Sequence, residues 1–105
     1  MEAALKAIAA PRRRRILSLV RDGELSAGEI AAHFEVTRPA VSQHLHVLKE
    51  AGLVNERRDG TKRLYRARPE GLAELKKFLE EFWDERLEVL KREAEKEEKE
   101  HGKNR

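Results

Sequence analysis

The strongest constraint on the fold is a pair of helix-start signals that lie close together in the sequence. The first is Ser26-Ala27-Gly28-Glu29, a capping box in which the serine hydroxyl accepts from a first-turn amide and the glutamate reaches back to the cap. The second is Thr37, an N-cap residue followed by Pro39 in the first turn. Because only the short turn Glu35-Val36 separates the two, the sequence predicts helices over 26–34 and 37–51 joined by a tight turn.

Two capped helices joined in this way are typical of a helix-turn-helix, in which the first helix braces the second against the major groove of DNA. In the second helix an apolar stripe of Val41, Leu45 and Leu48 would face the core. The polar side chains opposite this stripe are Arg38, Ser42, Gln43, His46 and Lys49. Arginine can contact guanine and glutamine can contact adenine through paired hydrogen bonds, whereas serine and threonine suit phosphates or either base.

A β-hairpin is predicted next in the chain. Residues 53–58 and 62–67 contain enough Leu, Val and Tyr to pair as strands, and Asp59-Gly60 is a strong two-residue turn signal. Gly52 ends the helix that precedes them. The basic residues around the turn are Arg57, Arg58, Lys62 and Arg63. So dense a positive tip suits phosphates or a narrow minor groove.

Helices are predicted at both ends of the chain. A short first helix stops before Pro11, and a second begins at Pro11 and ends near Asp22-Gly23. After Pro69 a long helix carries the apolar residues Leu72, Leu75, Leu79, Phe82, Trp83, Leu87 and Leu90. The expected architecture is therefore mainly α with a two-stranded wing: one winged helix-turn-helix domain over 1–95, then a charged, frayed tail over 96–105.

Charge and composition narrow the function class. Residues 1–68 carry fourteen Lys/Arg against eight Asp/Glu, a net charge of +6, whereas residues 69–105 carry nine against twelve, a net charge of −3. The basic half is where a polyanion would bind. The sequence has no cysteine, which excludes disulfides, cysteine-bound zinc and thiol nucleophiles. With no apolar run able to span a bilayer and no signal-peptide pattern, we expect a cytoplasmic protein.

These motifs, in this order, resemble the ArsR-type winged-helix repressors of bacteria. The matching runs are Leu25–Ala31, Ser42-Gln43-His44-Leu45, Leu48, Gly52-Leu53-Val54, Arg57–Gly60 and Leu64-Tyr65, together with Ala10-Pro11 through Ile16-Leu17. The resemblance implies a homodimer that binds an inverted repeat of double-stranded DNA. It also implies DNA contacts at Thr37, Arg38, Pro39, Ser42 and Gln43 and, on the wing, at Arg58, Lys62 and Arg63. His46, which faces outward on the second helix, would either contact the DNA backbone or be solvated. The dimer interface would come from the first and last helices, at Leu5, Ile8, Leu79, Phe82, Trp83, Leu87 and Leu90.

The sequence departs from the metal-sensing members of that family. Ser26 and Gly28 stand where those members have a cysteine pair, and Asp84 has no histidine two residues on. We therefore expect no metal site and no cofactor, and the sequence does not identify an effector.

Several alternatives stay open at this point. The run Arg12–Arg15 would either clamp phosphates or simply solvate its helix, and His44, on the apolar side, is expected to be packed and hydrogen-bonded. An enzyme is not expected, because no nucleophile, base and orienting group occur together. A winged-helix protein–protein module is one rival function. A metal-responsive repressor that uses Asp84, Glu85, Glu88 and His101 is another.

Overall fold

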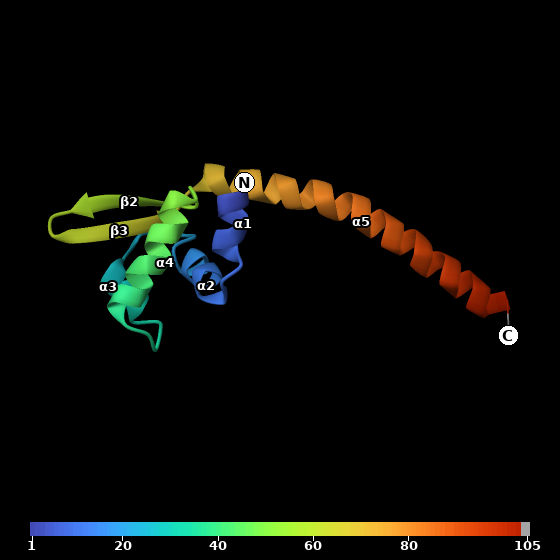
Figure 1. Ribbon diagram of the computed structural model, residues 1–105, viewed down its shortest axis with the longest axis horizontal. Helices are drawn as coiled ribbons and strands as arrows, with labels where there is room; N and C mark the ends of the chain where they lie inside the picture. Colours follow the sequence, from blue (N-terminus) through green and yellow to red (C-terminus); the bar gives the residue numbers. More distant parts are fainter. Residues whose placement is uncertain (104–105) are drawn as a thin grey trace. The chain divides into compact units, whose positions relative to one another are not determined.

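The computed structural model describes the backbone of residues 1–103 and the side chains of residues 1–97. Its contacts divide the chain into two compact units, Met1–Leu75 and Lys76–Arg105. The elements follow the chain in the order α1 (Glu2–Ile8), α2 (Pro11–Leu19), β1 (Leu25–Ser26), α3 (Ala27–Ala31), α4 (Arg38–Glu50), β2 (Val54–Asp59), β3 (Lys62–Ala67) and α5 (Pro69–Lys103) (Figure 1). This is the predicted winged helix-turn-helix, with α4 as the second helix of the motif.

The strands form one antiparallel sheet in the order β1-β3-β2. The sequence predicts two strands, and the third, β1, is only two residues long and pairs Leu25 with Tyr65 of β3. The hairpin turn also differs by one residue from the predicted Asp59-Gly60. Asp59 pairs with Lys62, so Gly60 and Thr61 form the loop, and Gly60 has a φ of 64°. A glycine suits this position because a positive φ costs it nothing.

The core of the first unit lies where the helices meet the base of the sheet. The side chains with no more than 2% of their surface exposed are Ala7, Ile16, Val20, Ile30, Val41, Leu45, Leu48, Leu53 and Val54. This confirms the stripe of Val41, Leu45 and Leu48 predicted on α4. Gly52, with a φ of 75°, follows the last helical residues of α4 as predicted.

Helix α2 ends earlier than the sequence predicts. The helix ends at Leu19, not at Asp22-Gly23, and Gly23 is not among the positive-φ residues of the described chain. The cause lies in the sheet: the N–H of Ala67, at the end of β3, donates to the carbonyl of Val20 over 3.0 Å. The backbone after Val20 then runs into β1 without further helical turns.

The arginine run at the start of α2 joins that helix to its neighbours. Arg13 donates from Nε to the carbonyl of Ala7 (2.6 Å), and Arg14 donates from Nη1 to the carbonyl of Ile8 (2.7 Å). These carbonyls close the last turn of α1, where helices leave acceptors unpaired. The guanidinium of Arg15 lies over the Phe34 ring, 5.1 Å from its centroid. The phosphate-clamp interpretation is therefore not needed for Arg13 and Arg14, which cap α1.

The second unit contains the rest of α5. The strongly exposed apolar side chains on it are Phe78, Phe82, Trp83, Leu87, Val89 and Leu90, between 40% and 58% exposed. The helix continues to Lys103, although the sequence predicts fraying from residue 96. The division into a domain over 1–95 and a tail over 96–105 stays a prediction. Across the described residues, no helix has the length and apolar character needed to cross a membrane.

Candidate nucleic-acid interface

A groove of about 730 Å³ runs between α4, the start of α3 and the hairpin of β2 and β3, which we call the wing. From α4 it is lined by Arg38, Ser42, His46 and Lys49. From the wing it is lined by Glu56, Thr61, Lys62, Arg63 and Tyr65, and from β1 and α3 by Ser26, Ala27, Gly28 and Glu29. The groove thus brings most of the outward face of the predicted second helix together with Lys62 and Arg63 of the basic tip.

The start of α4 is fixed by local hydrogen bonding. The Thr37 hydroxyl accepts from the backbone N–H of Ala40 over 3.3 Å, as predicted for an N-cap residue, and Pro39 occupies the first turn. Residues four and three apart, Ser42, His46 and Lys49, then lie on one face, because an α-helix has 3.6 residues per turn. The cap therefore sets which side chains of α4 line the groove.

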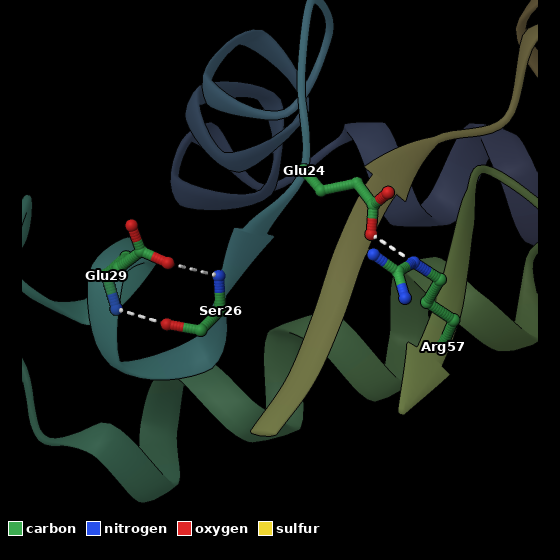
Figure 2. A network of polar contacts seen from close by, with 4 residues as sticks. All are labelled: Glu24, Ser26, Glu29 and Arg57. Carbon is green, nitrogen blue, oxygen red and sulfur yellow. Dashed lines mark hydrogen bonds and ion pairs between the residues drawn. The ribbon is translucent and has the colours of Figure 1, made fainter. Parts of the chain in front are cut away.

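The start of α3 is a complete capping box at the edge of the groove. Figure 2 shows the two reciprocal bonds: the Glu29 N–H donates to Oγ of Ser26 (3.1 Å), and the Ser26 N–H donates to Oε1 of Glu29 (3.0 Å). The bond from the Ser26 amide lowers the pKa of Glu29 most, followed by the bond with the Ser26 side chain, and the charge of Lys62 lowers it further. The carboxylate is therefore held ionised beside the wing.

The other side of the wing is tied to the chain ahead of β1. Arg57 donates from Nε to Oε2 of Glu24 over 2.7 Å, as Figure 2 shows. Successive side chains of a strand point to opposite faces, so Arg57 lies away from Glu56, which lines the groove. Arg57 belongs to the predicted basic tip, but in the structure its side chain is engaged with Glu24.

A polar chain crosses the floor of the groove. The Tyr65 hydroxyl donates to Oε2 of Glu56 (3.0 Å), and the same oxygen lies 3.7 Å from Nζ of Lys49. Burial raises the pKa of Tyr65, and the bond to Glu56 raises it further, so the hydroxyl keeps its proton and donates. The cross-strand pairing of Glu56 with Tyr65 brings these two side chains together.

Five of the nine predicted DNA contacts line this groove: Arg38, Ser42, His46, Lys62 and Arg63. Thr37, Pro39, Gln43 and Arg58 are exposed nearby but do not line it. The groove also contains three residues that were not predicted from the sequence, Glu56, Thr61 and Tyr65. The available signal was the two-residue repeat of strands, which puts Arg63 and Tyr65 on one face. Contact between any of these residues and DNA stays a prediction.

The metal-responsive alternative has a weak structural basis. Asp84, Glu85 and Glu88 line a shallow pocket on α5 together with Arg92, whose positive charge opposes a cation. The side chain of His101 lies outside the described residues. In the part of the chain whose side chains are described, no three His, Asp or Glu residues are arranged to hold a metal ion.

Comparison with known proteins identifies the family. The model of the family described as bacterial regulatory protein, arsR family, matches residues 10–56, from the start of α2 into β2. The HTH-type transcriptional regulator Rv2034 of Mycobacterium tuberculosis is 48% identical over 84 residues, which cover 80% of this chain and 78% of the relative. This chain belongs to the ArsR family. It is accordingly a DNA-binding transcriptional regulator, with the fold that the resemblance predicts.

Two further comparisons support this assignment to the ArsR family. The transcriptional repressor SdpR of Bacillus subtilis is 43% identical over 60 residues, covering 57% of this chain and 67% of the relative. The crystal structure of a possible transcriptional regulator for arsenical resistance is 47% identical to this chain, with a TM-score of 0.76. That match covers 83% of this chain and 91% of the solved chain. The similarity therefore extends well beyond the helix-turn-helix itself.

Proposed function

We propose that this ArsR-family chain is a homodimeric repressor that binds an inverted-repeat operator in double-stranded DNA. In this proposal α4 enters the major groove and the wing lies against the neighbouring backbone. The observation that carries it is the groove in which Arg38, Ser42 and His46 of α4 face Lys62 and Arg63 of the wing. Both sets of side chains can reach one duplex together.

Charge at the wing supports a polyanionic partner. Arg58 and Arg63 are directly opposite each other across the hairpin, and both are exposed. Like charges in such cross-strand pairs are destabilising. A phosphate backbone offsets that cost, because each basic side chain that neutralises a phosphate also releases a condensed counterion.

The proposal divides the contacts between sequence reading and positioning. Gln43 and Arg38, both exposed on α4, carry side-chain groups that can pair with base edges, whereas Lys62, Arg63 and Arg58 on the wing would meet phosphates. Thr37, Pro39, Ser42 and His46 complete the surface of α4 that faces DNA. Sequence preference should thus depend on α4 and general affinity on the wing.

The dimer is supported by the apolar surface of the two terminal helices. Leu5 and Ile8 on α1 stay half-buried, and on α5 Phe82, Trp83, Leu87 and Leu90 are between 44% and 58% exposed, with Leu79 half-buried. A second copy of this chain would remove this surface from water. A twofold dimer presents two α4 helices, so the half-sites should lie roughly 34–36 Å apart, one helical turn of DNA, or a multiple of it.

The direction of regulation rests on the relatives. SdpR is named as a transcriptional repressor. We propose repression for this chain on that basis, and no enzymatic activity.

One selection experiment tests the proposal. Protein is incubated with random duplex DNA, bound molecules are amplified over several rounds, and the recovered sequences are aligned. We expect an inverted repeat whose half-sites have the spacing given above. Recovery of random sequence would contradict sequence-specific binding, whereas a single unrepeated site would contradict the twofold dimer.

A further inference from the structure

The groove contains negative as well as positive charge. Glu29 and Glu56 line it together with Arg38, His46, Lys49, Lys62 and Arg63. A carboxylate on a surface that approaches DNA phosphates costs affinity, because like charges repel across a desolvated contact. Glu29 is accounted for by the capping box of α3. Glu56 lies within strand β2 and does not cap a helix as Glu29 does.

The carboxylate of Glu56 is held in place by the hydroxyl of Tyr65. Tyr65, only 6% exposed, donates its hydroxyl to Oε2 of Glu56, and the side chain of Glu56 is 18% exposed. A half-buried carboxylate fixed by a buried donor does not swing into solvent as a free surface glutamate does. Its negative charge therefore stays on the floor of the groove.

The basic neighbour of this carboxylate is Lys49. Its Nζ lies 3.7 Å from Oε2 of Glu56, and its side chain is 48% exposed. Lys49 belongs to the same face of α4 as Ser42 and His46, so its position alone would make it a phosphate contact. The fixed carboxylate opposes the positive field that Lys49 would otherwise present to a phosphate.

We propose that Glu56 is a positioning residue that neutralises Lys49 within the DNA-binding groove and so withholds one phosphate contact per subunit. The inference rests on the proposed DNA-binding face. It makes Glu56 a determinant of how tightly, and with what salt dependence, the protein binds any duplex. Lys49 is then a cation of the groove that does not count toward the counterions released on binding.

The test replaces Glu56 with glutamine and measures affinity for a scrambled duplex over a salt series. The Gln amide oxygen still accepts from Tyr65, so the fold is kept while the charge is removed. We expect the slope of log affinity against log salt to steepen by about 0.9 per subunit. Affinity at 0.1 M salt should rise roughly fivefold to tenfold per subunit.

Three further variants show whether Lys49 causes the gain. Glu50→Gln removes the same charge from an exposed residue of α4 that does not line the groove. It should give less than half of the increase in slope and affinity that is expected for Glu56→Gln. Lys49→Ala alone should lower the salt slope by less than half of the value of about 0.9 that is expected for one phosphate contact. In the double variant Glu56→Gln/Lys49→Ala the gain should disappear, which isolates the coupling between the two residues.

Specific results overturn the inference. If Glu56→Gln leaves the slope unchanged, or if Glu50→Gln steepens it equally, Glu56 does not control a phosphate contact. If Lys49→Ala alone lowers the slope by about 0.9 per subunit, Lys49 already contacts a phosphate. Should Glu56→Gln fail to fold, this lysine variant decides the question alone. If the wild-type protein binds no duplex, the proposed function itself is refuted. If the wild-type protein binds duplex DNA and one of the contradicting results named in this paragraph is found, only the inference about Glu56 is refuted.

Discussion

Nδ1 of His44 on α4 lies 3.5 Å from Nη1 of Arg13 on α2. Burial lowers the pKa of His44 most, and the positive charges of Arg13 and Arg12 lower it further. The folded state therefore prefers the neutral imidazole, as the predicted packing of this residue requires. Arg13 also donates to the last turn of α1, so His44 sits where α1, α2 and α4 are joined.

This lowered pKa predicts a pH-dependent stability. Between the folded pKa and the unfolded value of 6.5, the unfolded state binds more protons, so the stability present above pH 6.5 is lost as pH falls through the folded pKa. Between pH 7.5 and pH 5.5, the free energy of unfolding measured with urea should fall less for His44→Gln than for the wild type. His33→Gln, at an exposed position, is the matched control and should behave as wild type. Equal losses in all three proteins would show that His44 titrates normally.

The capping box of α3 makes a second prediction. Ser26→Ala removes the acceptor for the Glu29 N–H and should cost about 1 kcal/mol of unfolding free energy. Ser18→Ala, at an exposed serine within α2, is the control and should have a much smaller effect. Because the pKa of Glu29 is lowered, the contribution of its carboxylate is present above pH 4.5 and lost as pH falls through the folded pKa. Denaturation curves for Glu29→Gln should therefore converge with wild type in acid, and a constant gap would count against the box.

Base reading and phosphate contact should separate by mutation. Gln43→Ala should cost about 1–3 kcal/mol on the preferred site and relax its sequence preference. Lys62→Ala should instead weaken operator and scrambled DNA alike and reduce the salt slope by about 0.9 per contact. Arg66→Ala serves as the control, since Arg66 is an exposed cation of β3 that does not line the groove. The division of contacts fails if the Gln43 and Lys62 variants lose affinity in the same sequence-blind way.

The terminal helices predict a dimer that mutation can weaken. Leu87→Glu and Leu90→Glu, combined in one chain, place charges on an exposed apolar part of α5 and should shift the protein toward monomer in sedimentation equilibrium. Lys76→Glu, on the same helix at an exposed position, is the charged control. A wild-type protein that is a stable monomer at micromolar concentration would rule the interface out.

Gly71 predicts a strong effect at a position with no polar function. A Cβ added there would overlap the carbonyl oxygen of Gly52, which belongs to the backbone and cannot rotate away. Gly71→Ala should therefore destabilise the protein by about 1–3 kcal/mol in thermal or chemical unfolding. Gly23→Ala is the control, because no atom lies within 4 Å of a Cβ at that residue. Similar stability for the two variants would show that the turns of α4 and α5 move apart easily.

Local signals account for what the sequence predicted correctly. The caps Ser26 and Thr37 and the left-handed Gly52 act within a few residues, so they could be recognised without knowing the fold. The apolar stripe of α4 repeats often enough to define its buried face. The outward polar face of α4 followed from the same stripe, because its residues lie opposite the stripe.

The missed features depend on contacts between distant segments. β1 is too short for strand alternation, and it exists because Leu25 meets Tyr65. The end of α2 depends on Ala67, which is far along the chain. In the wing, Asp59-Gly60 and Gly60-Thr61 are both acceptable turns, and the register of the strands decided between them. The carboxylate of Glu56 on the groove floor likewise required the cross-strand position of Tyr65.

The contact between Gly52 and Gly71 also affects how the molecule can move. Here the turn after α4 meets the first turn of α5 backbone to backbone, with Arg68 donating from Nη1 to the Gly52 carbonyl over 3.3 Å and from its N–H to the Leu53 carbonyl over 2.8 Å. Packed side chains can absorb a small displacement by changing rotamer, but no side chain separates these two glycines. A tilt of the first turn of α5 would therefore press directly on the backbone that follows α4, the helix that we propose enters DNA.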